Sequence, residues 1–417
     1  MKLTSTIASL VALIAIPFAF AEAPIKNAGV SKDLVVPDRY IVIYKQKADP
    51  ALREKHEQDI DKKGKNAKKG GVVNKLDLGD LHGYIAEIPA STLKDVVASD
   101  LASIDFVELD TIVRVSPIKL EDDKIVEKRA FETQANGPWG LARISHRSPG
   151  FSDYVYDNSG GEGIRVYVVD TGIMTNHTDF EGRAIHGMNF ALGTPNTDEN
   201  GHGTHVAGTI GGKTYGVAKK ATLVSVKVLD ASGAGTFAAV MEGIAWAVLN
   251  AQANGGANKA VINVSLGGGN NGLLNTIVDI ASGFGATVVA AAGNDNDDAA
   301  NHSPASALSA ITVGALDQAD SRAYFSNFGR LVNIFAPGVG VLSACLSAVS
   351  NSESCSYSGT SMAAPHISGL AAYYIKLCGL AGSTAVTNKI IETATMNTLG
   401  DSQGSPRRIA YNLATGP

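Results

Sequence analysis

Four nearly continuous apolar runs constrain what the chain can fold into after residue 129. A strand that is buried on both faces reads as an unbroken apolar run, whereas a strand with one wet face alternates. Helical segments such as residues 236–252 separate these runs. This alternation predicts an α/β fold with a doubly wound, mostly parallel sheet, and a functional site at the carboxyl ends of its strands. The runs are Val166–Val169, Leu223–Val228, Ala260–Val264 and Ala286–Ala291.

The composition of the chain changes near residue 129. Residues 22–129 are rich in lysine, and strand patterns at Tyr40–Tyr44 and Tyr84–Ile88 flank a helical pattern at Ala51–Lys63. Interleaved strands and helices over so short a stretch predict a small α+β domain of the ferredoxin-like kind. A polar stretch ending in Lys128-Arg129 follows and is typical of an exposed, cleavable linker.

The N-terminus has the pattern of a secretory signal peptide over residues 1–21. Lys2 provides the positive start, residues 7–20 the apolar stretch, and Ala19-Phe20-Ala21 a small-x-small cleavage site. A retained membrane anchor is the alternative. No later stretch has 18 apolar residues without charge, so we expect a secreted, extracellular protein with no further contact with a membrane.

Charge and cysteine content exclude further classes. The chain has 35 basic and 40 acidic residues, a net charge of −5, so no basic excess is present to bind nucleic acid. Its three cysteines, Cys345, Cys355 and Cys378, allow at most one disulfide within the chain. Cys345 and Cys355 are the favoured pair because they close a short loop.

Two motifs supply a carboxylate and an imidazole. Asp170 directly follows a buried apolar run, although a turn or helix-cap aspartate would look the same. His202 lies between two glycines and is followed by His205. A pair of core histidines or a metal pair is the alternative there, but no third ligand stands at helical spacing.

A third motif supplies a hydroxyl at Ser361, in Ser358-Gly-Thr-Ser-Met-Ala-Ala-Pro-His366. At a helix N-terminus, backbone N–H groups would favour an oxyanion beside this serine; a plain serine cap is the alternative. Acyl transfer needs a hydroxyl nucleophile, an imidazole and a carboxylate. The chain order Asp, His, Ser differs from that of α/β-hydrolases and of chymotrypsin-type enzymes.

With these motifs the sequence resembles the subtilisin-like serine peptidases, in particular the fungal secreted branch typified by proteinase K, and it is similar to cuticle-degrading proteases. The motifs are Val169–Gly172, Gly201–His205 and Gly359–Pro365, and the resemblance covers essentially all of residues 22–417. It implies an inhibitory propeptide at 22–129 and a peptidase domain at 130–417. The expected partners are protein and peptide substrates and the chain's own propeptide, with the enzyme a monomer.

The resemblance also assigns substrate contacts. Asn294 is implied as an oxyanion donor beside the Ser361 N–H; without the resemblance it reads as a turn residue. Phe237 is implied at the rim of an apolar pocket, with a core-facing residue as the alternative. None of the implied walls carries a charged side chain, so we expect apolar or aromatic residues before the scissile bond. The implied substrate-binding residues are Gly233, Ala234, Gly235, Phe237, Ser265, Leu266, Gly267, Ala291, Ala292 and Gly293.

Some positions depart from the family pattern. Asn333 stands where relatives use an aspartate for calcium, which weakens a structural calcium site, and the chemistry itself requires no cofactor. Asn176 and Asn301 lie in glycosylation sequons, whereas the sequon at Asn263 falls inside a predicted buried strand.

Two other classes compete with a peptidase. A catalytically silent binding protein on the same fold would lack one of the catalytic residues, and all are present. A dinucleotide-binding oxidoreductase would need G-x-G-x-x-G after its first strand, and Asp170-Thr171-Gly172 does not provide it.

Overall fold

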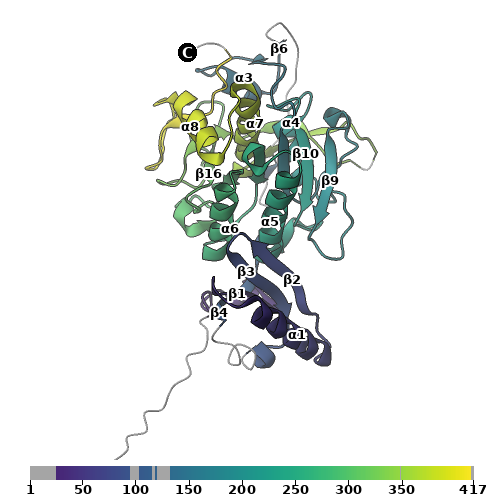
Figure 1. Cartoon of the computed structure of the whole chain (residues 1–417). Coiled ribbons are helices and arrows are strands. Elements are labelled where there is room, and N and C mark those ends of the chain that lie inside the picture. Colours follow the sequence, from purple (N-terminus) through teal and green to yellow (C-terminus); the bar gives the residue numbers. More distant parts are fainter. Residues whose placement is uncertain (1–24, 94–102, 115–117, 120–131, 348, 415–417) are drawn as a thin grey trace, which may run out of the picture.

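The computed structural model describes residues 25–93, 103–114, 118–119, 132–347 and 349–414. These form an N-terminal domain, up to residue 114, and a larger C-terminal domain, from residue 132 (Figure 1), and residues 118–119 pair with Ser354–Ser358 of the C-terminal domain. The expected signal peptide and the Lys128-Arg129 pair lie outside the described residues. No helix in the described ranges is both long and apolar enough to cross a membrane.

The C-terminal domain is organised around a nine-stranded sheet. The four strands predicted from apolar runs lie side by side at its centre, and every printed pairing in it is parallel except β20 with β21. In spatial order the strands are β20 (Thr395–Met396), β21 (Arg408–Ile409), β17 (Ile334–Pro337), β16 (Ile311–Leu316), β14 (Thr287–Ala291), β12 (Ala260–Val264), β8 (Arg165–Asp170), β10 (Thr222–Lys227) and β9 (Ala184–Asn189).

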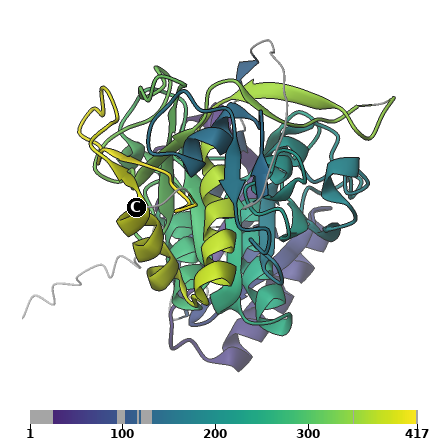
Figure 2. The same ribbon diagram turned by 90° about the horizontal axis from the view of Figure 1, so that it is seen from above.

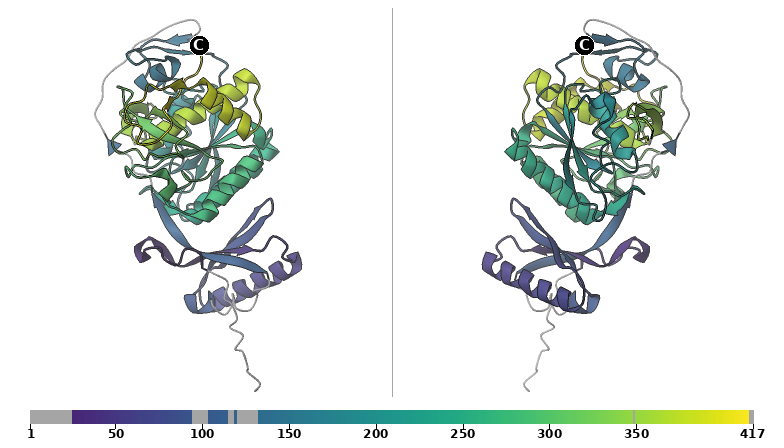
Figure 3. Two further views of the ribbon diagram at one scale, coloured as in Figure 1. Left: turned by 90° about the vertical axis from the view of Figure 1, so that its left-hand side faces the viewer. Right: turned by 90° about the vertical axis from the view of Figure 1, so that its right-hand side faces the viewer.

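Helices cover both faces of this sheet, which confirms the doubly wound α/β architecture (Figures 2 and 3). One apolar cluster joins the sheet to α5 (Phe237–Ala253) and α6 (Gly272–Gly283). A second cluster joins the opposite face to α4 (His202–Gly211), α7 (Thr360–Cys378) and α8 (Ser383–Thr393). Strands covered on both sides explain why these runs carry no polar alternation.

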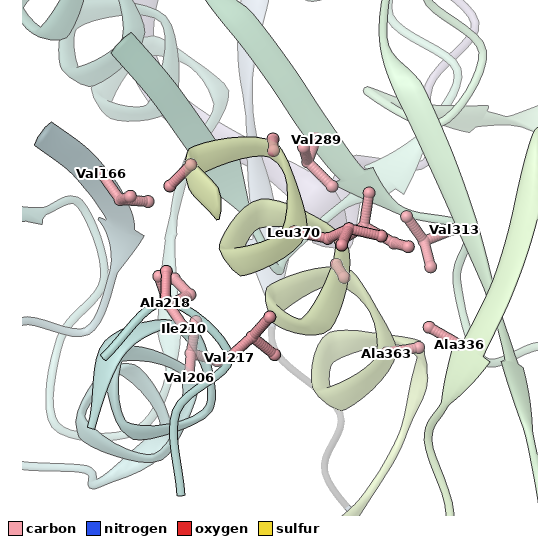
Figure 4. Close-up of a cluster of buried hydrophobic side chains, with 14 of the residues drawn as sticks. Val166, Val206, Ile210, Val217, Ala218, Val289, Val313, Ala336, Ala363 and Leu370 are labelled. Carbon is pink, nitrogen blue, oxygen red and sulfur yellow. The ribbon is translucent and has the colours of Figure 1, made fainter. Parts of the chain in front are cut away.

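Helix α7 is buried along nearly its whole length. Leu370, fully buried, lies near Val289 and Val313 of the sheet (Figure 4). Gly369 lets α4 and α7 approach closely, because a Cβ there would lie 2.9 Å from the carbonyl oxygen of Ile210 in α4. Burying one large aliphatic side chain contributes about 1.5–3 kcal/mol, so this packing fixes the N-terminus of α7 against the sheet.

The N-terminal domain is a four-stranded antiparallel sheet in the order β4-β1-β3-β2, with a helix crossing between β1 and β2. This is the strand order of a ferredoxin-like fold. Its two faces follow the period-two pattern of strands: Tyr40 and Val42 pack with Ile60 of the helix, whereas Ile41 and Ile43 face α5 and α6. The elements are β1 (Val35–Tyr44), α1 (Pro50–Asn66), β2 (Gly71–Leu78), β3 (Leu81–Glu87) and β4 (Ile104–Arg114).

The end of the chain is tied back to the start of the C-terminal domain. The N–H of Asn412 donates to the carbonyl of Ile144 at 2.8 Å, and its side-chain amide donates to Val155 at 2.8 Å. The remaining elements are β5 (Ile118–Lys119), β6 (Glu132–Gln134), α3 (Trp139–Ser145), β7 (Tyr154–Tyr156), β11 (Ala234–Thr236), β13 (Gly268–Gly269), β15 (His302–Ser303), β18 (Val341–Ala344) and β19 (Ser354–Ser358), with short 3-10 turns at 32–34, 178–180, 257–259 and 299–301.

Candidate active site

Asp170 and His202 form a buried hydrogen-bonded pair. Asp170 ends β8, and His202 is the first residue of α4. The Nδ1 atom of His202 lies 2.7 Å from Oδ1 of Asp170, and both side chains are fully buried. The N–H of Thr171 also donates to this oxygen, at 2.8 Å. With Nδ1 donating to the carboxylate, Nε2 is the ring nitrogen that can accept a proton.

The two glycines beside His202 have separate structural roles. Gly201 has φ +99°, a left-handed conformation that turns the chain into α4. Gly203 faces the end of β8, where an added Cβ would lie 2.1 Å from the carbonyl oxygen of Gly172. Glycine at both positions therefore lets the start of α4 approach the carboxylate of Asp170 closely.

Ser361 lies at the N-terminus of α7 and is 3% exposed. Its hydroxyl donates to the carbonyl of Ser265 at 2.9 Å, and the hydroxyl of Ser265 donates to the carbonyl of Ser361 at 3.0 Å. Within the described residues, Nε2 of His202 is buried without a hydrogen-bond partner. In this state Ser265, and not His202, therefore orients the Ser361 hydroxyl; hydrogen bonds between nucleophile and base often tighten only when substrate is bound.

Asn294 and the Ser361 N–H flank the same point beside Gly359. The Oδ1 atom of Asn294 accepts from the N–H of Thr360 at 2.8 Å and from its hydroxyl at 2.9 Å, which fixes the direction of the side-chain amide. A Cβ built on Gly359 would lie 3.3 Å from Nδ2 of Asn294 and 3.6 Å from N of Ser361. The two nitrogens therefore both lie near Gly359, and a pair of N–H donors that reaches one oxygen can stabilise an oxyanion.

Strand β4 of the N-terminal domain lies between the two segments expected to bind substrate. It pairs antiparallel with β11, with Val113 opposite Gly235 and Arg114 opposite Ala234. The N–H of Arg114 also donates to the carbonyl of Gly267, at 3.4 Å. An extended peptide therefore already contacts both edges through its main chain.

The other expected substrate-binding residues are mostly buried in the C-terminal domain. Ala291, Ala292 and Leu266 are buried, and Gly293 has φ +106°. The N–H of Gly233 donates to Asp230 in a turn before β11. Phe237 is 4% exposed and belongs to the same apolar cluster as Val113 of β4, so it is a core residue that also adjoins the segment in the cleft.

The other histidines near Ser361 and His202 are structural. Burial lowers the pKa of His205 to about 3 and that of His366 to about 4, so both are neutral near pH 7. Nε2 of His205 donates to the carbonyls of Val341 and Cys355, at 2.9 and 3.1 Å. No group of three metal-binding side chains occurs in the described part of the chain.

Three further expectations concern binding or modification. The Oδ1 atom of Asn333 accepts from the N–H of Thr312 at 2.7 Å, and its side chain offers no carboxylate charge to a calcium ion. Cys345 and Cys355 form a disulfide, and Cys378 is exposed with a free thiol. Of the sequon asparagines, Asn176 and Asn301 are exposed, whereas Asn263 is fully buried.

Several charged residues around the site were missed by the sequence patterns. Asp198 accepts hydrogen bonds at the start of α4, and its position four residues before His202 could have indicated a helix cap. Glu108 and Asp110 of β4 contact the N-termini of α6 and α5 through Asn271 and Ala238. These last contacts join distant segments and have no local signal.

Residues 161–411 match the model of the subtilase family, Peptidase_S8, so the chain belongs to the subtilase family of serine proteases. It is 44% identical to Subtilisin-like protease 2 of Pseudogymnoascus destructans, covering 94% of this chain and 92% of the relative. It is 41% identical to a cuticle-degrading serine protease of Arthrobotrys oligospora, covering 98% and 99%. A solved cold-adapted subtilisin-like serine proteinase is 40% identical, with a TM-score of 0.63, and covers 67% of this chain and 99% of that one.

Proposed function

We propose that this subtilase is a secreted serine endopeptidase made as a zymogen, with Asp170, His202 and Ser361 as its catalytic triad. The carrying observation is the buried 2.7 Å pair of His202 and Asp170, and the nitrogens of Asn294 and Ser361 that both lie near Gly359 support it. No metal or other cofactor is required for this chemistry.

The proposed reaction proceeds through an acyl-enzyme. The Ser361 hydroxyl turns from Ser265 toward Nε2 of His202, which takes the proton as Oγ attacks the peptide carbonyl. Asn294 and the Ser361 N–H stabilise the oxyanion, and Asp170 stabilises the imidazolium. His202 then returns the proton to the leaving amine, and water hydrolyses the ester by the same steps.

Active-site titration tests this proposal against a silent binding protein of the same fold. A serine-directed phosphonylating reagent should label the wild type at Ser361 with one equivalent, and His202→Ala should slow labelling strongly. Asp179→Asn serves as a control, since Asp179 is a buried carboxylate outside the proposed triad. A wild-type protein that is folded but unlabelled would refute the peptidase mechanism.

Residues 22–129 act, in our proposal, as an inhibitory propeptide that follows a signal peptide at 1–21. The support is the pairing of β4 with β11 and Gly267, which occupies both substrate edges. We expect cleavage near Lys128-Arg129, so that the mature chain of 130–417 starts near Ala130. Mass spectrometry of the secreted, unreduced protein checks the new N-terminus, the disulfide and glycans at Asn176 and Asn301 together. An N-terminus before residue 100 would refute this processing.

Specificity should favour apolar or aromatic residues before the scissile bond. The expected pocket walls, Ser265–Gly267 and Ala291–Gly293, have no carboxylate that could compensate the desolvation of a substrate Lys or Arg. Tetrapeptide amides ending in Phe, Leu, Ala, Arg and Glu provide the assay, with Phe or Leu expected to have the largest kcat/KM and Glu the smallest. A clear preference for Arg would contradict the pocket assignment.

The proposed substrates are extracellular proteins, including those of a host cuticle. The names of the relatives from Metarhizium anisopliae and Arthrobotrys oligospora support this class. We further propose that the enzyme is a monomer, and that neither nucleic acid nor membrane is a partner. Release of soluble peptides from insoluble cuticle, compared with casein and with the Ser361→Ala variant, tests the substrate class.

A further inference from the structure

One buried carboxylate, that of Asp198, accepts five hydrogen bonds. It is 2% exposed and lies in the loop before α4. Its Oδ1 atom accepts from the N–H groups of Asn200 and Gly201, at 3.0 and 2.9 Å, and from the hydroxyl of Thr171 at 2.9 Å. Its Oδ2 atom accepts from the N–H and the hydroxyl of Thr204, at 3.0 and 2.6 Å. An ordinary helix cap needs only one or two such bonds.

Groups that donate to Asp198 lie next in sequence to both members of the Asp170–His202 pair. Thr171 directly follows Asp170, and its N–H donates to the Asp170 carboxylate. The hydroxyl of Thr171 donates to Asp198 and accepts from the N–H of Gly203, at 2.9 Å in each case. Because Gly203 follows His202, Asp198 and Thr171 together connect the end of β8 to the first turn of α4.

A buried ammonium group holds Thr171 from a different side. Nζ of Lys227 donates to the carbonyl of Thr171 at 2.7 Å and to that of Leu229 at 2.9 Å, and its side chain is 1% exposed. Lys227 stands opposite Asp170 in the pairing of β10 with β8. The residue after the catalytic carboxylate is therefore fixed by an anion at its hydroxyl and by a cation at its carbonyl.

We infer that Asp198 is a positioning residue for the proposed triad: through Thr171 and the N-terminus of α4, it holds the imidazole of His202 in register with the carboxylate of Asp170. This inference rests on the proposed function. Asp198 itself contacts neither substrate nor the reacting atoms. A carboxylate is suited to this role because it accepts at every lone pair, whereas an amide would direct one N–H₂ group at the donors of Thr204.

The test compares Asp198→Asn with Asp179→Asn. Both replace a buried carboxylate by its amide, and Asp179 accepts from the N–H of Thr214 beyond the C-terminal end of α4. Asp198→Asn should lower kcat by about 10- to 100-fold with KM changed less than about twofold, because misplaced catalytic groups reduce the rate rather than substrate affinity. Asp179→Asn should lower the melting temperature and leave kcat within about twofold of the wild type.

A second pair of variants keeps the inference testable if Asp198→Asn does not fold. Thr171→Val removes the connecting hydroxyl at nearly constant shape, whereas Thr171→Ser retains it, so the valine variant should have the lower kcat. NMR adds a direct readout: the strongly deshielded proton between His202 and Asp170 should broaden in the Asp198 and valine variants only.

Equal kcat in the folded Asp198→Asn variant and the wild type, or equal kcat in the two Thr171 variants, would overturn the inference. Failure of the proposed function itself looks different, because the wild type would then not be labelled at Ser361 by the phosphonylating reagent.

Discussion

The two domains bury their apolar surfaces in different ways. The central sheet of the C-terminal domain has both faces covered by helices of its own domain. The N-terminal sheet covers one face with α1 and lays the other, with Ile41, Ile43 and Ile85, on α5 and α6. Exposing each such side chain costs about 1.5–3 kcal/mol, so the N-terminal domain depends on its neighbour for one of its two faces.

The polar contacts of that shared face also differ from those in the C-terminal core. Asp110 accepts from the N–H of Ala238 at the start of α5 and pairs with Arg39 at 3.2 Å. Glu242 of α5 is buried close by. Because burial raises the pKa of both Asp110 and Glu242, this interface is sensitive to pH. The comparison indicates a durable C-terminal core and a conditional association of the N-terminal domain.

The largest expected effect tests whether the chemistry resides entirely in the C-terminal domain. Ser361→Ala should lower kcat by about 10⁶-fold while the melting temperature stays near that of the wild type, since the hydroxyl contributes to the reaction and little to packing. The double variant His202→Ala/Ser361→Ala should be no slower. Steady-state assays check both, and losses that add independently would contradict the triad.

The next effect concerns the second oxyanion donor. Asn294→Ala should reduce kcat by about 10²- to 10³-fold with little change in KM, because the donor acts on charge that develops only in the transition state. Asn254→Ala, at an exposed asparagine beyond α5, is the matched control and should retain full activity. A change confined to KM would assign Asn294 to substrate binding instead.

Local patterns predicted the centre of the site because its residues lie in short motifs. Asp170 ends an apolar run, and His202 and Ser361 begin helices after glycines, so their motifs contain both the chemistry and the turn that presents it. Sequence segments of similar length were also enough to predict the four central strands of the sheet.

The parts that were missed depend on segments distant in sequence. Asp110 reaches α5 across 128 positions, and no pattern within β4 indicates that contact. The Ser361 hydroxyl donates to the carbonyl of Ser265, 96 positions away, and no local pattern indicates that contact either. Such choices are decided by tertiary packing, which sequence periodicity does not encode.

The next prediction concerns how association of the two domains depends on pH. Burial raises the pKa of Asp110 to about 6 and that of Glu242 to about 7, above their ordinary values of 3.8 and 4.5. At a pH between the ordinary and the raised pKa of each group, the carboxyl keeps its proton in the complex and loses it in the separated domains. Association therefore strengthens as pH falls and weakens as pH rises through 6 to 7. We expect residues 22–129 to bind the Ser361→Ala form of 130–417 at least about tenfold more tightly at pH 5 than at pH 8.

Calorimetric titration over that pH range measures this dependence. Asp110→Asn combined with Glu242→Gln should weaken this dependence, because those two side chains no longer titrate, whereas Glu108, whose pKa is also raised by burial, still does. Glu132→Gln, at an exposed position of the C-terminal domain, should leave the dependence unchanged. Tighter binding at pH 8 than at pH 5 would contradict the assignment.

The smallest effect concerns Phe237, which lies in one cluster with Val113 of β4. The relevant substrate position is the fourth residue before the scissile bond. Phe237→Ala should lower kcat/KM by about tenfold for peptides with a large apolar residue at this position, and leave kcat/KM nearly unchanged for peptides with alanine there. It should weaken binding of residues 22–129 in parallel, since Val113 loses the same partner. Val113→Ala should affect only that binding. Unequal responses of peptide and N-terminal domain would show that they occupy different places.

The hydrogen bonds from Asn412 to Ile144 and Val155 have a consequence for biosynthesis. Because Asn412 completes contacts with Ile144 and Val155 at the start of the C-terminal domain, a ribosome must synthesise the chain as far as residue 412 before that domain can close. The N-terminal sheet is complete once Arg114 has been synthesised, and domains fold in general as units in order of emergence. For most of translation the nascent chain therefore carries a finished first domain and an unfinished second one. The interval between the two is set by the length of the polypeptide and the speed of elongation.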